Sequence, residues 1–118
     1  MFTIKNLCPP LLLSIPLLLA GCSGHPAAGT WQIREGSAIP YARLVVQFDG
    51  KAEFFRPNEE RPAERCFWAG ESADAIALQC IEAADTGQEH FYRLKVRGGG
   101  VGELIQEGRL LGMLDELE

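Results

Sequence analysis

Positive charge is scarce in this sequence. The 118 residues include 11 lysines and arginines against 16 aspartates and glutamates, which gives a formal net charge of −5. A nucleic-acid-binding domain has the opposite balance, so the composition excludes that class of protein. The chain is also too short for a two-domain enzyme. Its hydrophobic share of 47% is typical of a folded domain rather than of a disordered segment.

Histidines and known catalytic or metal-binding motifs are equally scarce. The chain has two histidines, His25 and His90, and no Cys-x-x-Cys pair. Residues 98–102 are glycine-rich but lack the Lys-Ser/Thr of a phosphate-binding loop, so they predict a turn. None of the possible hydrolytic partners of a histidine stands in a nucleophile-elbow context. We therefore expect no enzymatic activity, no cofactor and no metal. Those possible partners are the nucleophiles Ser37, Ser72 and Thr86 and the acids Glu82 and Asp85.

No uninterrupted hydrophobic run is long enough to cross a membrane. The apolar stretch at residues 7–19 follows Lys5 and contains Pro9, Pro10 and Pro16. A spanning helix needs about 20 apolar residues, and proline breaks helices. A positive residue followed by a short apolar stretch is typical of a secretory signal. We therefore predict that residues 1–21 are a signal peptide.

The sequence Leu19-Ala20-Gly21-Cys22 ends this stretch. It resembles the lipobox of bacterial lipoproteins. The resemblance implies that a diacylglyceryl group is attached to the Cys22 sulfur, that the signal is cut before Cys22, and that the new amine is acylated. Ser23, in place of an aspartate, implies sorting to the outer membrane. We thus expect a protein anchored by its acyl chains to the periplasmic face of that membrane.

The four cysteines then divide into three groups. Cys8 is removed with the signal and Cys22 carries lipid, which leaves Cys66 and Cys80 in an oxidising compartment. Strand alternation places these two opposite each other in a hairpin with Glu71–Ala75 as its turn, and a disulfide there would stabilise the domain by roughly 3 kcal/mol. A zinc or redox site would need further ligands. Without residues 1–21, 10 basic and 16 acidic residues remain, a net charge of −6.

The remaining chain is patterned as short strands. We predict a flexible lipidated tether at residues 22–29 and one domain at residues 30–118. Period-two alternation, interrupted by turns such as Asp49-Gly50, predicts an all-β, antiparallel up-and-down meander closing into a barrel. Helical spacing at the end of the chain leaves residues 109–118 open as a strand or a short helix. The expected strands are 30–35, 42–48, 51–56, 65–69, 75–81, 89–96, 101–106 and 109–115.

One face of these strands is expected to form the core. The inward side chains are Trp31, Ile33, Leu44, Val46, Phe48, Trp68, Ile76, Leu78, Tyr92, Leu94 and Val96. At the start of the first strand, Gly29-Thr30-Trp31 resembles the Gly-x-Trp motif of the calycin group, which includes the lipocalins. That resemblance implies a lipocalin-like barrel in which Trp31 closes one end and a basic residue of the last strand, here Arg109, stacks across it.

Three functions are weighed at this stage, and the third of them, hydrolytic activity, has no legible catalytic constellation behind it. We expect a lipid-anchored interaction module, an accessory or inhibitor of an envelope protein, whose contacts come from the charged, proline-containing segment 56–65. This segment is alternatively a plain solvated loop. The second function is lipocalin-like binding of a small apolar ligand inside the barrel, although Trp31 also suits a core position without any ligand. The candidate partner-binding residues are Arg56, Glu59, Glu60, Arg61 and Arg65, and the candidate ligand-binding residues are Trp31, Phe48, Trp68 and Tyr92.

Overall fold

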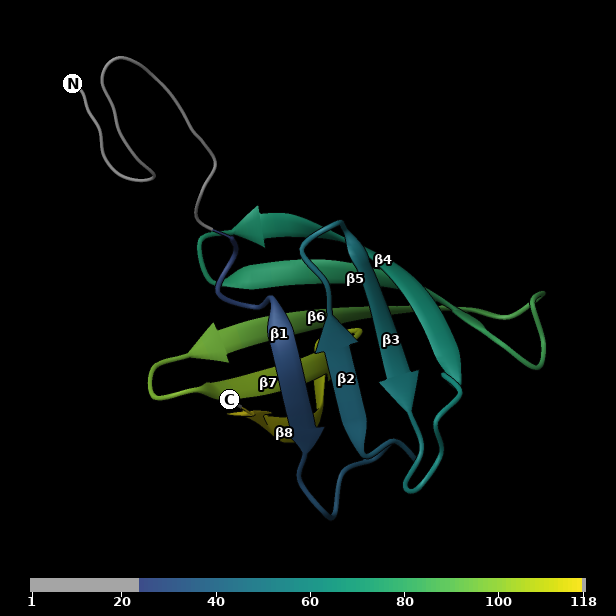
Figure 1. Ribbon diagram of the computed structural model, residues 1–118. Helices are drawn as coiled ribbons and strands as arrows, with labels where there is room; N and C mark the ends of the chain where they lie inside the picture. Colours follow the sequence, from purple (N-terminus) through teal and green to yellow (C-terminus); the bar gives the residue numbers. More distant parts are fainter. Residues whose placement is uncertain (1–23, 118) are drawn as a thin grey trace.

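The computed structural model describes residues 24–117, so the expected signal peptide and Cys22 lie outside the described residues. The chain forms eight antiparallel strands, each paired with the next, and β8 pairs with β1 to close a barrel (Figure 1). The expected all-β meander is confirmed. In this part of the chain no helix is long and apolar enough to cross a membrane. The strands are β1 (Gly29–Ile33), β2 (Arg43–Val46), β3 (Lys51–Phe55), β4 (Glu64–Ser72), β5 (Ala75–Glu82), β6 (Glu89–Arg97), β7 (Val101–Gln106) and β8 (Arg109–Leu117).

The last segment, which the sequence left open, is a strand. Glu107 and Gly108 precede β8 with φ values of +52° and +78°. Two successive residues with positive φ form the tight turn that joins antiparallel strands. β8 then pairs with β7 on one side and with β1 on the other. A helix at this position would leave both of those strand edges unpaired.

The β2–β3 hairpin differs from expectation by one residue. Val46 pairs with Ala52, so the loop is Phe48-Asp49-Gly50 rather than the two residues Asp49-Gly50. Gly50 has φ +90°, as a three-residue hairpin loop requires. The expected place of Phe48 in the core is therefore wrong. Its side chain lies at the hairpin tip and is 77% exposed.

The interior of the barrel is packed with side chains from all eight strands. Most of the expected core residues are buried, and Trp68 and Val96 are partly buried. Trp31 has no exposed surface. A Cβ atom added to Gly102 would lie 3.1 Å from its ring, so β7 approaches this indole closely. The fully buried apolar side chains include Trp31, Phe54, Leu44, Ile76, Leu78, Leu94, Leu104 and Leu114.

The expected stacking of Arg109 on Trp31 is wrong. Trp31 pairs with Glu116 on β8. Arg109 lies seven residues earlier on the same strand, which is roughly 23 Å away. The cation–π contacts found among residues 24–117 involve Arg43 and Arg56 instead. The Gly-x-Trp motif thus places a core tryptophan but not the basic partner that the calycin resemblance implies.

The predicted disulfide between Cys66 and Cys80 is present. The two cysteines are direct partners on β4 and β5, with Cα atoms 4.0 Å apart, and both are buried. The neighbouring pairs Trp68–Leu78 and Gly70–Ile76 also match the expected register. Only the turn differs, because both strands continue to Ser72 and Ala75 with a register shift between Gly70 and Ser72.

The connections between strands gather at two ends of the barrel (Figure 1). The N-terminal end holds the first described residues and the turns at residues 47–50, 73–74 and 98–100. The loop end holds the connections at residues 34–42, 56–63, 83–88 and 107–108.

The start of the described chain is packed against the N-terminal end. His25 Nε2 donates to the Ser72 carbonyl at 2.8 Å, and His25 Nδ1 accepts from the Ala27 amide at 3.0 Å. Ala27 is fully buried, and its carbonyl accepts from the Trp31 indole nitrogen at 2.9 Å. Hydrogen bonds and burial thus pack residues 25–28 of the expected tether against the barrel.

Candidate functional site

The loop end contains a carboxylate that is completely buried. Glu64 has no exposed surface, and it is the one charged residue among residues 24–117 that is buried. It is the first residue of β4 and is in phase with Cys66 and Trp68, so its side chain points into the barrel. Burial of an unpaired carboxylate is strongly unfavourable. The surroundings of Glu64 must therefore supply hydrogen bonds.

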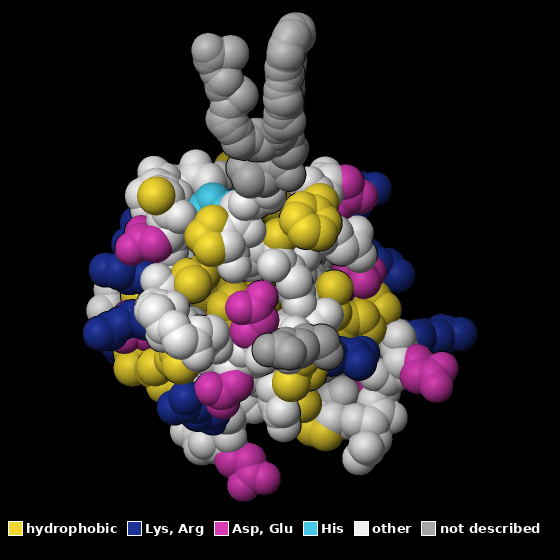
Figure 2. All heavy atoms as spheres, turned by 60° about the vertical axis from the view of Figure 1, so that its left-hand side comes forward, with side chains coloured by type: hydrophobic (Ala, Val, Ile, Leu, Met, Phe, Trp, Pro, Cys, Tyr) yellow, Lys and Arg dark blue, Asp and Glu magenta, His cyan; other side chains and the backbone are white. Residues whose placement is uncertain are grey.

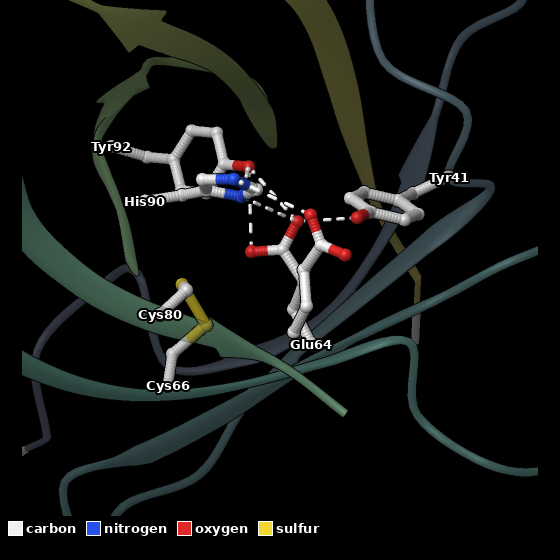
Figure 3. Close-up of polar contacts among 7 residues, drawn as sticks. Tyr41, Glu64, Cys66, Cys80, His90 and Tyr92 are labelled. Carbon is white, nitrogen blue, oxygen red and sulfur yellow. Dashed lines mark hydrogen bonds and ion pairs between the residues drawn. A yellow bond between two sulfur atoms is a disulfide. The ribbon is translucent and has the colours of Figure 1, made fainter. Parts of the chain in front are cut away.

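Three side chains donate to this carboxylate (Figure 3). The Tyr41 hydroxyl, from the loop between β1 and β2, donates to Glu64 Oε2 in a short hydrogen bond. The Tyr92 hydroxyl and His90 Nδ1, both from β6, lie 3.1 Å from the same oxygen. We call Tyr41, Glu64, His90 and Tyr92 the carboxylate cluster. Its donors come from distant parts of the chain, so the cluster ties the β1–β2 loop, β4 and β6 together.

The cluster reaches the surface through His90. Its Nε2 atom is 3.5 Å from Glu82 Oε2, and its side chain is 28% exposed. His90 thus lies between a buried carboxylate and a partly exposed one. A cation also covers the cluster, because the Arg56 guanidinium is 5.6 Å from the centre of the Tyr41 ring. The charged β3–β4 loop therefore begins directly over this cluster.

Both tyrosines of the cluster resist ionisation. Burial raises the pKa of Tyr41 well above its ordinary value, and the hydrogen bond and the negative charge of Glu64 raise it further. The pKa of Tyr92 is raised for the same reasons, with burial again the largest. A phenolate here would be desolvated and would face a carboxylate. Each hydroxyl consequently remains a hydrogen-bond donor to Glu64.

The hydrogen bonds of the cluster satisfy its buried carboxylate. Glu64 accepts from three donors, as a stable buried carboxylate needs. Of the nucleophiles considered for a triad, Ser72 lies at the N-terminal end and donates to Asp74 at 2.8 Å, far from His90. No group of three metal-ligating side chains is found in residues 24–117. The geometry brings no nucleophile of that set into hydrogen bonding with His90.

The four candidate ligand-binding residues do not share one interior surface. Trp31 and Tyr92 are buried in the core, whereas Phe48 is exposed at a hairpin tip. Trp68 is partly buried, and its indole nitrogen donates to the Gln47 carbonyl at 2.7 Å. Tyr92 is brought to Glu64 instead of to the other three. Ligand binding inside the barrel remains an untested prediction, and these residues do not form the site expected for it.

The candidate partner-binding residues separate into two places. Arg56, Glu59, Glu60 and Arg61 are exposed in the β3–β4 loop. The first three line a hollow of about 490 Å³ together with Arg43, Pro57 and neighbouring residues. Arg65 instead lies on β4, points outward, and has its guanidinium 3.8 Å from Glu53. It belongs to the barrel wall rather than to the loop.

The wall around Arg65 has an aromatic surface that the sequence analysis did not identify. Phe67 and Phe91 are 67% and 59% exposed, and both pair with Gln79, which lies between them. Neighbouring strands are about 4.8 Å apart, so the two phenylalanines stand roughly 10 Å from each other. We call this surface the outer patch. It has two rows across β3, β4, β5 and β6, which are Lys51-Phe67-Gln79-Phe91 and Glu53-Arg65-Ile81-Glu89.

The outer patch also contains a hollow. A depression of about 490 Å³ is lined by Glu53, Arg65, Phe67, Gln79, Ile81 and residues beside them. Charged groups surround the apolar ones, including the Arg65–Glu53 pair and a hydrogen bond of 3.4 Å from Gln79 to Glu89. Strand alternation could have predicted these two exposed rings. An inward Trp68 requires an outward Phe67, and an inward Tyr92 requires an outward Phe91.

Comparisons with known protein families, curated proteins and solved structures find no match to this chain.

Proposed function

We propose that this chain is a lipoprotein, anchored through Cys22 at the periplasmic face of the outer membrane, that binds an envelope protein through its outer patch. The observation that carries the proposal is the exposure of Phe67 and Phe91 on one wall of a barrel whose interior is packed. Large aromatic side chains on a small domain are normally placed in the core. Two of them, side by side on the outside, favour an external contact.

The chemistry of the outer patch suits a protein partner. Aromatic residues are enriched at protein interfaces, and a few buried aromatic anchors dominate the binding energy. Full burial of one phenylalanine contributes about 1.5–3 kcal/mol. The charges of Lys51, Glu53 and Glu89 around the two rings would form the polar rim of such an interface.

Two sequence features support the location. The lipobox resemblance of residues 19–22 supports the anchor, and the net charge of the mature chain keeps a lipid-tethered domain soluble. Arg65, a candidate partner-binding residue, is part of the outer patch. The exposed loop residues from Arg56 to Arg61 lie at the adjoining loop end and can extend the contact.

Site-specific photo-crosslinking in cells tests the proposal. A benzophenone amino acid is introduced at residue 67 or 91, and at Leu110 as the control. Leu110 is 55% exposed and lies on β8, four strands from β4 on the opposite wall. We expect one discrete envelope protein to be crosslinked from residues 67 and 91 and not from residue 110. Absence of any adduct at residues 67 and 91, or the same adducts from all three positions, would contradict the proposal.

A further inference from the structure

We infer that the N-terminal end of the barrel lies directly on the bilayer, with Phe48 inserted among the lipid headgroups and upper acyl chains. This inference rests on the anchoring through Cys22 proposed above. It adds an orientation and a second membrane contact, neither of which lipidation alone would determine.

Only a short length of chain separates the anchor from the barrel. From His25 onward the backbone is fixed by hydrogen bonds to Ser72 and by the burial of Ala27. Cys22 is only three residues before His25, and three residues reach at most about 11 Å. An acylated Cys22 therefore holds the N-terminal end of the barrel at the membrane surface, with no room for a long spacer.

Phe48 lies beside the first residues of the described chain. A Cβ atom added to Gly24 would lie 2.4 Å from the Phe48 ring, so this ring is beside the point where the chain leaves the barrel. It is 77% exposed, the largest exposed fraction among the large hydrophobic side chains of residues 24–117. Figure 2 shows hydrophobic side chains around the start of the described chain.

The charged groups toward this end offset one another. Arg93 and Arg97, which lie toward this end, are in ion pairs with Glu71 and Glu103, each with an N–O distance of 2.5 Å. Paired arginines offer little attraction to anionic lipids. Two lysines, Lys51 and Lys95, also lie toward this end, and so do three acidic residues, Asp49, Asp74 and Glu116. The end therefore carries no net positive charge, and an aromatic ring at a hairpin tip is suited to the bilayer interface. We expect the membrane contact to depend little on salt or on the share of anionic lipid.

The orientation places the loop end away from the membrane. Strands of four to nine residues span roughly 13–30 Å, so the β3–β4 loop extends about that far into the periplasm. The outer patch then lies on the side wall, open to a protein partner. The fixed start of the chain thus determines which surfaces of the barrel a soluble or membrane-bound protein can reach.

Spin-label accessibility on the full acylated protein tests the inference. The protein is reconstituted in vesicles of phosphatidylethanolamine and phosphatidylglycerol, and acylation of Cys22 is verified by mass spectrometry. One label replaces Asp49, beside Phe48, and the matched control label replaces Glu59 in the β3–β4 loop. The buried disulfide cysteines do not react. We expect a water-soluble nickel chelate to reach residue 49 several-fold less than residue 59, and Phe48→Ser to remove most of this difference.

The possible failures are distinguishable. If Cys22 is acylated and the chelate reaches residues 49 and 59 equally, the orientation is wrong while the proposed anchoring stands. Shielding of residue 49 that persists unchanged with Phe48→Ser would overturn the insertion of Phe48. A chain whose Cys22 carries no lipid overturns both the anchoring and the orientation.

Discussion

The carboxylate cluster should make the free energy of unfolding depend on pH under alkaline conditions. The chain has two tyrosines, and both belong to the cluster. Their pKa values are raised in the folded protein by burial and by Glu64, whereas in the unfolded chain each is about 10. Below about pH 10 both states carry neutral tyrosines, so these groups add no pH dependence to stability.

Above about pH 10 the unfolded chain loses protons that the folded protein retains. The free energy of unfolding then falls with rising pH, by about 1.4 kcal/mol per pH unit for one tyrosine and about 2.7 for two. This dependence continues until the pH reaches the raised pKa values of the folded protein. Tyr41→Phe or Tyr92→Phe should halve the part of this pH dependence that comes from the two tyrosines. The two variants thereby distinguish the titration of the tyrosines from that of the lysines.

Two measurements across alkaline pH test this prediction. Tyrosinate absorbance reports the ionisation of the tyrosines, and urea unfolding reports the free energy of unfolding. We expect no tyrosinate signal while near-ultraviolet circular dichroism reports a folded protein. The signal should appear together with cooperative unfolding. Tyrosinate that forms near the ordinary pKa of 10 in a folded protein would refute the reasoning, because at least one hydroxyl would then be in contact with water rather than with Glu64.

Three further predictions concern stability, each measured as the change in free energy of unfolding in urea. Glu64→Gln turns an acceptor of three hydrogen bonds into a side chain with one acceptor oxygen, and should lower stability by about 1–3 kcal/mol; an unchanged value would show that the donors are not engaged. Replacing Cys66 and Cys80 together by alanine should lower it by about 3 kcal/mol, and reducing agent should then have no further effect. Gly112→Ala should cost about 1–3 kcal/mol, because the new Cβ would lie 2.6 Å from a side-chain atom of the β1–β2 loop. Gly98→Ala is its control and should be nearly neutral, since nothing lies within 4 Å; equal effects would contradict the close approach at residue 112.

The fold could be predicted because alternation and turn residues agree along the whole chain. Inward residues such as Leu78 and Leu94 fixed the faces of their strands, and the opposed cysteines fixed one register. The error at Phe48 arose from the loop length. A glycine with positive φ suits both two-residue and three-residue hairpin loops, and a difference of one residue moves a side chain from the core to the tip.

The carboxylate cluster was harder to predict. Glu64 precedes the expected start of its strand by one residue, although its phase with Cys66 and Trp68 is a readable signal for an inward carboxylate. Tyr41 lies outside any strand, so no periodicity indicates its direction. Only the closed barrel brings it to His90 on β6. Contacts between a loop and a distant strand depend on closure, which local sequence patterns do not determine.

The most direct test of the account is the intact mass of the protein extracted from membranes. The lipid anchor, the processed chain and the disulfide each change this one measurement. We predict a chain that begins at Cys22, carries acyl groups, and lacks the two hydrogens lost on joining Cys66 to Cys80. A chain that begins elsewhere, or one whose Cys22 carries no lipid, would contradict the anchored module and the orientation derived from it.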